Sequence, residues 1–416
     1  GGLAGILQHE RIVAPVAPLP VDARAGSRSL QDQLSEIQQL RSPGADLGAG
    51  VRTRKGEDGM SRLSDMKTPV EITFPVGDGK AAIRVTPVSV SAGAVGTDYA
   101  SSSRFGGGPV AAAAQAAGTV GTAGSQRQQS TGLAFGYTQG RIDADIGTTP
   151  LGFEHSRLIG GIKLQGALSD RVSNQLDVSR RAVTDSVLSF AGTRDDRTGK
   201  SWGGVTATGA RYLIGADRGG TGGYGAVPYA RLDGTNVVSN SRLEGGVGVY
   251  TRVIDGPGQR LTTGLNLTAL AFDKNLRYFT HGHGGYFSPQ RFVSLSVPLT
   301  WARTQDRLSY QVGGSLGLQH FREDGADYFP GDAGAQSAAA GAATAAGSGN
   351  ATYAGHGKAG LGYQNVWSYL LSEDKHLVAG GNLGLDNASD YRQFVGKLYL
   401  RYRMHPLAGS PPLPLA

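Results

Sequence analysis

Two histidines in the segment HGHGGYF, His281 and His283, have the side chains and spacing that could hold a metal ion. Imidazole nitrogens are common ligands for zinc and other transition metals. No carboxylate lies close to them in the sequence, and the segment is rich in glycine. We therefore predict no metal site, and we interpret the pair as ordinary loop histidines or as residues that gate a passage.

The patterns that could support catalysis are weak. Residues 313–317 read GGSLG and match the G-x-S-x-G nucleophile pattern, but Ser315 lies in an alternating segment without the helix that a nucleophile elbow requires. Asp195 and Asp196 could act as paired carboxylates, yet a solvated, salt-bridged loop explains them more simply. A glycosidase would need two carboxylates facing each other across a cleft. We predict no catalytic residue, no enzymatic activity and no cofactor.

The composition excludes several classes of protein. The 416 residues include 66 glycines and no cysteine, and 39% are hydrophobic. The glycines follow no collagen repeat, and the absence of cysteine excludes disulfide scaffolds and thiolate metal centres. No apolar run approaches the roughly 18 residues of a transmembrane helix. The net charge of +7 is scattered along the chain rather than clustered, so we predict no nucleic-acid partner.

The N-terminal part, residues 1–66, differs from the rest. Three prolines within residues 11–26 indicate a stiff linker. The apolar spacing from Leu30 to Leu40 predicts an amphipathic helix that ends before Pro43. A single short helix cannot bury a core, so we expect it to dock on the following domain or on a helical region absent from this chain. We predict that residues 1–66 form this linker and helix.

From about residue 70 the apolar residues recur at every second position, which indicates β-strands. In residues 393–403, for example, Phe394, Leu398 and Leu400 alternate with the charged residues Lys397 and Arg401. These segments run 10–14 residues, which is longer than most strands of soluble sheets and long enough for a tilted bilayer crossing. Placing Lys397 or Arg401 against lipid would cost roughly 2–4 kcal/mol each at the bilayer midplane. We predict an all-β transmembrane antiparallel barrel whose polar face lines the lumen.

Sixteen segments fit this pattern, among them 70–75, 81–93 and 185–190, so we predict about 16 strands in a barrel over residues 67–404. An even number places both chain ends on one side of the membrane. The stretch 94–130 conflicts with this scheme because it falls on the side of the short turns. Either it is a periplasmic insertion, or an early strand is misplaced.

Three further features complete this prediction. The low-complexity stretch 331–352 is expected to be a mobile extracellular loop. Residues 405–416 form a proline-rich tail that cannot join the sheet. Aromatic residues near strand ends are expected to form interfacial girdles. They are Phe272, Trp301, Phe321, Trp367 and Tyr391.

Three long segments resemble the C-terminal domain of the bacterial cellulose synthase operon protein C family. They are TPLGFEHSRLIGGIK (149–163), SRRAVTDSVLSFAGTRDDRTGKSWGGVTATGARY (179–212) and KNLRYFTHGHGGYFSPQRFVSLSVP (274–298). The similarity extends over residues 68–403, and the GGYFSPQ block at 284–290 is long enough to be specific. The resemblance implies a sixteen-stranded outer-membrane barrel that exports cellulose, with both termini in the periplasm. It also implies periplasmic tetratricopeptide repeats, absent from this chain, that connect the barrel to the inner-membrane cellulose synthase complex.

A conduit for a glucan chain needs many weak polar partners and no deep trap, so that the polymer can both enter and leave. Periodicity places nine candidate residues on the lumenal face: Lys397, Tyr399, Arg401, Arg403, Gln311, Ser315, Gln319, Asn266 and Thr268. The loop of His281 and His283 either gates the extracellular exit or folds into the mouth and packs through Tyr286 and Phe287. The alternatives to an export pore are a general diffusion porin and, less favoured, a barrel-housed outer-membrane hydrolase. Besides the cellulose chain and the synthase complex, the only partner that we expect is the lipid of the outer membrane.

Overall fold

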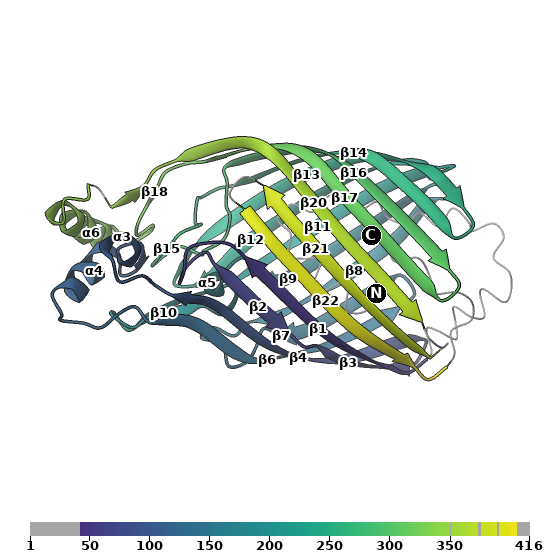
Figure 1. Cartoon of the computed structure of the whole chain (residues 1–416), viewed down its shortest axis with the longest axis horizontal. Helices are drawn as coiled ribbons and strands as arrows, with labels where there is room; N and C mark the ends of the chain where they lie inside the picture. Colours follow the sequence, from purple (N-terminus) through teal and green to yellow (C-terminus); the bar gives the residue numbers. More distant parts are fainter. Residues whose placement is uncertain (1–41, 350, 373–375, 389–390, 406–416) are drawn as a thin grey trace.

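The computed structural model describes residues 42–349, 351–372, 376–388 and 391–405, and it shows a closed antiparallel β-barrel (Figure 1). The large sheet contains 18 segments. One of them, β10 (Thr193–Asp195), belongs to a loop and pairs only with β11. Two others, β2 (Leu63–Lys67) and β3 (Val70–Val76), are halves of one strand, because both pair with the same two neighbours. The barrel therefore has 16 strands, which confirms the predicted fold.

The remaining strands follow one another around the barrel in chain order. They are β1 (Gly44–Arg54), β4 (Gly79–Ala94), β6 (Ser125–Gln139), β7 (Ile142–Thr148), β8 (Leu158–Ser169), β9 (Val172–Ala182), β11 (Lys200–Arg218), β12 (Thr221–Thr235), β13 (Val237–Gly256), β14 (Gln259–Phe272), β16 (Arg291–Gln305), β17 (Leu308–Glu323), β20 (His356–Ser372), β21 (Leu377–Ala388) and β22 (Tyr391–Arg403). Among the residues described, no helix combines the length and the apolar character needed to cross a membrane.

The first strand closes the barrel against the last one. β1 pairs with β22 in antiparallel register from Gly44 opposite Arg403 to Arg54 opposite Gln393. The predicted boundary at residue 67 is therefore wrong, because residues 44–66 belong to the barrel. Short apolar residues alternate with glycine and polar residues in β1, and this pattern is too weak to distinguish it from a linker. The predicted helix Leu30–Leu40 and the tail beyond His405 lie outside the described residues.

A second error compensates for the missed strand. The predicted strand at 185–190 is instead the helix α5 (Val187–Ala191), which begins with a reciprocal capping box between Ser186 and Ser189. The prediction missed β1 and added a strand at 185–190, so the total of 16 is unchanged. These two errors also explain the conflict over residues 94–130. With β1 in place, the connection 95–124 lies at the same end as 273–290 and 324–355, so it is not an insertion among the short turns.

The exposed fraction of each side chain alternates along the strands, as expected for a barrel with an apolar outer face. On β17, Leu316 and Leu318 are about 60% exposed on the outside, whereas Gln311 on the inside is 6% exposed. The outward series on β16 runs from Arg291 to Trp301. Ten residue steps at about 3.3 Å and a tilt of about 40° span roughly 25 Å, the height of a lipid-facing band.

The aromatic girdle is only partly as predicted. Trp301 lies on the outward series and packs edge-on against Tyr310 of the neighbouring strand, with ring centroids 5.4 Å apart. Phe272 and Phe321 instead belong to the inward series of β14 and β17, and they pack among the loops at the barrel mouth. Trp367 and Tyr391 lie in strands β20 and β22. Position near a strand end alone therefore did not separate girdle residues from residues that support the loops.

The seam between the first and last strands carries an ionic cluster on its inward face. The carboxylate of Asp46, whose side chain is 1% exposed, contacts the guanidinium groups of Arg401 at 3.2 Å and Arg403 at 2.9 Å. We expect Asp46→Asn to lower the free energy of unfolding by about 2 kcal/mol, because two lumenal cations lose their shared partner. The heat resistance of the folded band in detergent electrophoresis measures this loss.

The exposed pair of Asp255 and Arg260 provides the control for the seam. Both side chains are well exposed, so Asp255→Asn should change the unfolding temperature little. Equal heat resistance of the Asp46→Asn variant and the unaltered chain would show that backbone pairing alone holds the seam.

Candidate functional site

The structure places the nine predicted lumenal residues on inward-facing positions of three strands. Asn266 and Thr268 lie on β14 and are each 6% exposed. Gln311, Ser315 and Gln319 alternate with exposed leucines on β17. The four residues of β22 alternate with Leu398, Leu400 and Tyr402, which are exposed on the outside. The inner wall therefore presents both neutral hydrogen-bonding groups and charges.

Many of the charges on the inner wall are already paired within it. Arg401 and Arg403 share Asp46, as described for the seam. Arg84 of β4 pairs with Glu71 of the neighbouring β3. The Tyr224 hydroxyl donates to Oδ1 of Asn266 at 2.5 Å. At these positions the charged groups of the wall neutralise one another.

Four connections at one end of the barrel interlock, and we call them the loop cap: residues 95–124, 183–199, 273–290 and 324–355 (Figure 1). They contain the helices α3 (Tyr99–Ser102), α4 (Gly108–Ala116), α5 and α6 (Ala333–Ala345). Two short pairings also lie in the cap. β5 (Phe105–Gly106) pairs with β15 (Phe279–Thr280), and β18 (Ala326–Asp327) pairs with β19 (Thr352–Tyr353).

The segment 183–199 crosses the mouth of the barrel. It leaves β9 and yet reaches β1, although five strands of the wall lie between β9 and β1. Arg52 of β1 donates to the carbonyl oxygen of Thr184 at 2.9 Å, and Arg54 donates to that of Asp185. The carboxylate of Asp185 in turn accepts from the backbone N–H of Phe287 at 3.1 Å. Three parts of the rim therefore meet over the lumen of a barrel about 30 Å wide.

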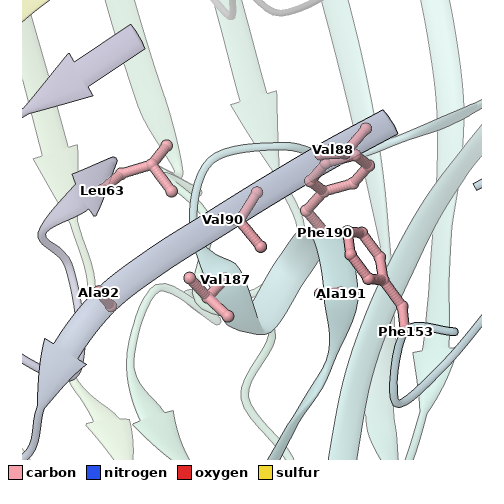
Figure 2. Packing of buried hydrophobic residues seen from close by; sticks show 8 residues of the cluster. All are labelled: Leu63, Val88, Val90, Ala92, Phe153, Val187, Phe190 and Ala191. Carbon is pink, nitrogen blue, oxygen red and sulfur yellow. The ribbon is translucent and has the colours of Figure 1, made fainter. Parts of the chain in front are cut away.

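An apolar cluster fixes the helix α5 inside the mouth (Figure 2). Val187 and Phe190 of α5 pack against Val88 and Val90, which face inward from the end of β4. Phe153, from the connection between β7 and β8, meets the Phe190 ring edge-on at 5.2 Å. Inward positions of a water-filled barrel are normally polar, so these apolar side chains mark the depth at which the cap replaces water.

A buried ion pair joins two segments of the cap. Asp195 and Arg197 have fully buried side chains and form a pair at 2.9 Å. Asp195 also accepts from the Gly107 N–H at 2.8 Å, and Arg197 donates to the carbonyl oxygens of Ser102 and Phe105. The predicted solvated loop at Asp195 and Asp196 is therefore wrong for Asp195. A glycine is required at position 106, where φ is +51° and a Cβ would collide with the Asp195 carboxylate.

The predicted loop residues lie in the interior of the cap. The His281 ring packs edge-on against Trp202 at 4.4 Å, and the backbone N–H of His281 donates to the Gly106 carbonyl oxygen. His283 is fully buried and its Nε2 donates to the Asp327 carbonyl oxygen at 2.9 Å. Tyr286 is 2% exposed, and Phe287 meets Phe321 edge-on at 5.4 Å. The loop is thus folded into the mouth and packed there.

Sequence reasoning missed the aromatic stack beside His283. The Tyr353 ring lies between those of Tyr278 and Tyr328, with centroids at 3.5 Å and 4.2 Å. Burial raises the pKa of all three hydroxyls, so they stay neutral at physiological pH. The described residues of the stretch 331–352 also do not form the mobile loop expected, because most of them form a helix. Asp332 caps α6, which packs against Phe329 through Ala339 and Ala343.

We expect mild acid to loosen the cap. Burial lowers the pKa of both His281 and His283 to about 4, against about 6.5 in an unfolded chain. Their neutral form contributes full stability above pH 6.5, and this contribution is lost as the pH falls toward 4. For His283 alone the loss is about 2 kcal/mol at pH 5. Single-channel recordings in planar bilayers should therefore show more frequent opening at pH 5 than at pH 7.

The partners of these histidines define the control for the acid experiment. His281 faces Asp195, Arg197 and Lys200. Burial raises the pKa of Asp185, so its protonation acts in the opposite direction and stabilises the cap in acid. A His283→Phe variant, which cannot be protonated at that position, should show a weaker pH response. An unchanged response in this variant would assign the effect to other groups.

The described residues contain no group of three His, Asp or Glu side chains that could hold a metal ion. Ser315 lies in the middle of β17, which continues to Glu323, so the strand-turn-helix geometry of a nucleophile elbow is not present there.

Comparisons with known proteins agree with this architecture. The chain is 44% identical to cellulose synthase operon protein C of Pseudomonas fluorescens over 376 residues, which cover 89% of this chain and 27% of the relative. It is 32% identical to the protein of the same name in Xanthomonas axonopodis pv. citri, over 95% of this chain and 36% of the relative. The chain thus spans about a quarter to a third of the length of these relatives.

A bacterial polysaccharide outer membrane secretin has a similar fold. The TM-score is 0.50 at 11% identity, over 87% of this chain and 98% of the secretin. The fold is thus that of a transmembrane β-barrel. Residues 61–405 match the family described as cellulose synthase operon protein C C-terminus. The chain belongs to this family of C-terminal barrel domains.

Proposed function

We propose that this barrel is an outer-membrane pore that conducts newly made cellulose from the periplasm to the cell exterior. The short-turn end, where β1 begins and β22 ends, faces the periplasm, and the loop cap faces outward. The proposal rests on one combination: membership of a family named for the cellulose synthase operon, together with a 16-strand barrel whose inner wall is lined with polar groups. The polymer passes without a chemical step, so the pore needs no catalytic residue.

The inner wall suits an uncharged β-1,4-glucan. Gln311, Ser315 and Gln319 face inward from β17. Ser315 and Gln319 are partly exposed and offer weak hydrogen bonds to the hydroxyl groups along the edges of a glucan chain, whereas Gln311 is buried within the wall. The cations of β22 stand beside Asp46, which limits their attraction for small anions. In this proposal the inner-membrane synthase supplies the driving force and connects to the barrel through periplasmic repeats.

The cap favours export over general diffusion. A buried ion pair, an apolar cluster and an aromatic stack hold the cap segments together across the mouth, and a porin for small solutes does not require such an ordered cap. We propose that the cap separates when a glucan chain arrives from the periplasmic side. His281, His283, Tyr286 and Phe287 then belong to the moving part.

The fate of glucan in cells without the barrel tests this function. Deletion of the barrel should leave cellulose in the periplasm while synthesis continues, and expression of the unaltered barrel should restore secretion. Normal secretion without the barrel would refute the proposal. The porin alternative predicts that small solutes of all kinds pass the purified barrel in planar bilayers, without any effect of added cello-oligosaccharides.

A further inference from the structure

The outer face of the barrel carries a cationic site just above the lipid-facing band. Arg291 of β16 and Arg322 of β17 are direct cross-strand partners, and both are exposed on the outward face. Like charges directly opposite each other in a sheet repel, so this pair is unfavourable unless an anion lies between them. His320, two residues along β17, faces the same side.

One nearby carboxylate neutralises this pair only in part. Asp324 lies 3.4 Å from Arg322, but both side chains are more than half exposed. Glu323 faces inward, where Arg277 and His356 hold its carboxylate. Within the described part of the chain, no carboxylate lies within ion-pair distance of Arg291. Arg231, another outward arginine at this end, differs because Asp233 contacts its guanidinium at 3.1 Å.

A groove lies next to this cationic site. It has a volume of about 370 Å³, lies beside Arg291, and is lined by His320, Arg322, Glu323, Asp324, Gly325, Gly355, His356 and Gly357. On the same face, Val293 follows Arg291 along β16, and Leu318 follows Arg322 and His320 along β17; the two apolar side chains are 46% and 62% exposed. The outer face therefore carries the cationic site and its groove at the end of β16 and β17, and apolar side chains further along the same two strands.

This order matches a lipid with a phosphorylated head group. We infer that Arg291, Arg322 and His320 bind the phosphate groups of a phosphorylated glycolipid in the outer leaflet, whose acyl chains lie along β16 and β17. Guanidinium groups pair with phosphate through two parallel hydrogen bonds, and basic pockets at the membrane surface bind anionic head groups. The distance of roughly 25 Å from Arg291 to Trp301 places the two residues at opposite membrane interfaces.

The inference rests on the proposed outer-membrane orientation, but its test does not use export. The full chain is reconstituted in phosphatidylcholine nanodiscs that contain lipid A with two phosphates, and bound lipid A is counted by native mass spectrometry. Arg291→Gln with Arg322→Gln should weaken binding on the order of tenfold or more. Arg291→Lys with Arg322→Lys should keep much of the affinity, because the charges remain.

Two controls separate the site from general attraction. Arg303→Gln removes an outward charge at the opposite end of β16 and should leave binding unchanged. Dephosphorylated lipid A should bind no better to the unaltered barrel than to the double glutamine variant. Equal binding of both lipids, equal loss in Arg303→Gln, or full competition by inorganic phosphate would each overturn the assignment. If the double variant fails to fold, Arg291→Gln alone supplies the measurement, because that side chain has no ion-pair partner to lose.

A failure of this test leaves the export proposal standing, because secretion is measured separately in cells. A failure of the secretion test likewise leaves the binding measurement valid, because that measurement depends only on the outer face of the barrel.

Discussion

An Asp195→Asn variant should hold its mouth open and conduct ions several times better than the unaltered barrel. The Asp195 carboxylate accepts from both the guanidinium of Arg197 and the backbone N–H of Gly107, and its side chain is fully buried. Without the negative charge, Arg197 keeps its neutral hydrogen-bond acceptors but is a buried cation without a carboxylate partner, which costs about 3–5 kcal/mol. Because the pair joins segments 95–124 and 183–199, the cost falls on the closed state of the cap. Single-channel conductance in planar bilayers measures the opening directly.

The control for this variant is the exposed pair of Asp233 and Arg231, whose side chains are 46% and 65% exposed. Asp233→Asn removes the same charge at the same end of the barrel, and it should leave conductance unchanged because exposed pairs contribute little. Growth of cells in the presence of a bulky antibiotic gives a second readout. An Asp195→Asn barrel that conducts no more than the unaltered one would show that other contacts keep the mouth closed.

A disulfide across the same two segments should have the opposite effect and stop export. A Cβ built at Gly107 would lie 2.6 Å from the Thr198 side chain, so the two Cβ positions are close enough for a disulfide. The backbone at Gly107 has φ near −74°, which other residues adopt without strain. Oxidised Gly107→Cys/Thr198→Cys cells should retain cellulose in the periplasm, and an added reductant should restore secretion.

The chain contains no cysteine, so this bond is the only disulfide that the barrel can form within itself. Each single cysteine variant is a matched control and should secrete normally in both redox states. Mass spectrometry of the cap peptides reports the fraction cross-linked. Full secretion from fully cross-linked cells would mean that the polymer leaves without separating segments 95–124 and 183–199.

The sequence predicted the wall of the barrel well because each strand carries its own signal. A strand between lipid and lumen must alternate, and Phe394 to Arg403 show this alternation without reference to any other segment. The inward placement of residues such as Gln311 and Asn266 follows from the same period. β1 escaped notice because its outward residues Ala45 and Ala49 are small and its inward positions include glycines, so the contrast between its faces is low.

The loop cap could not be predicted because its contacts join segments that are distant in sequence. The Asp195 carboxylate accepts a hydrogen bond from Gly107, which lies 88 residues earlier, and the Tyr278 ring stacks on that of Tyr353. Without these distant contacts, the charged residues 194–197 are expected to be solvated, and the alanine-rich stretch 331–352 is expected to be mobile. The triple glycine at 106–108 was a local signal of such a contact, because a backbone without side chains allows another segment to approach closely.

The seam between β1 and β22 has a consequence for how the protein is made. Until Gly44 meets Arg403, every partly built sheet exposes two unpaired edges that invite aggregation. The contact that removes both edges joins almost the two ends of the described chain, so it has the greatest sequence separation in the sheet and forms among the last. A product truncated before β22 would therefore keep a permanent open edge. Only a chain that contains both β1 and β22 can therefore bury these two edges against each other.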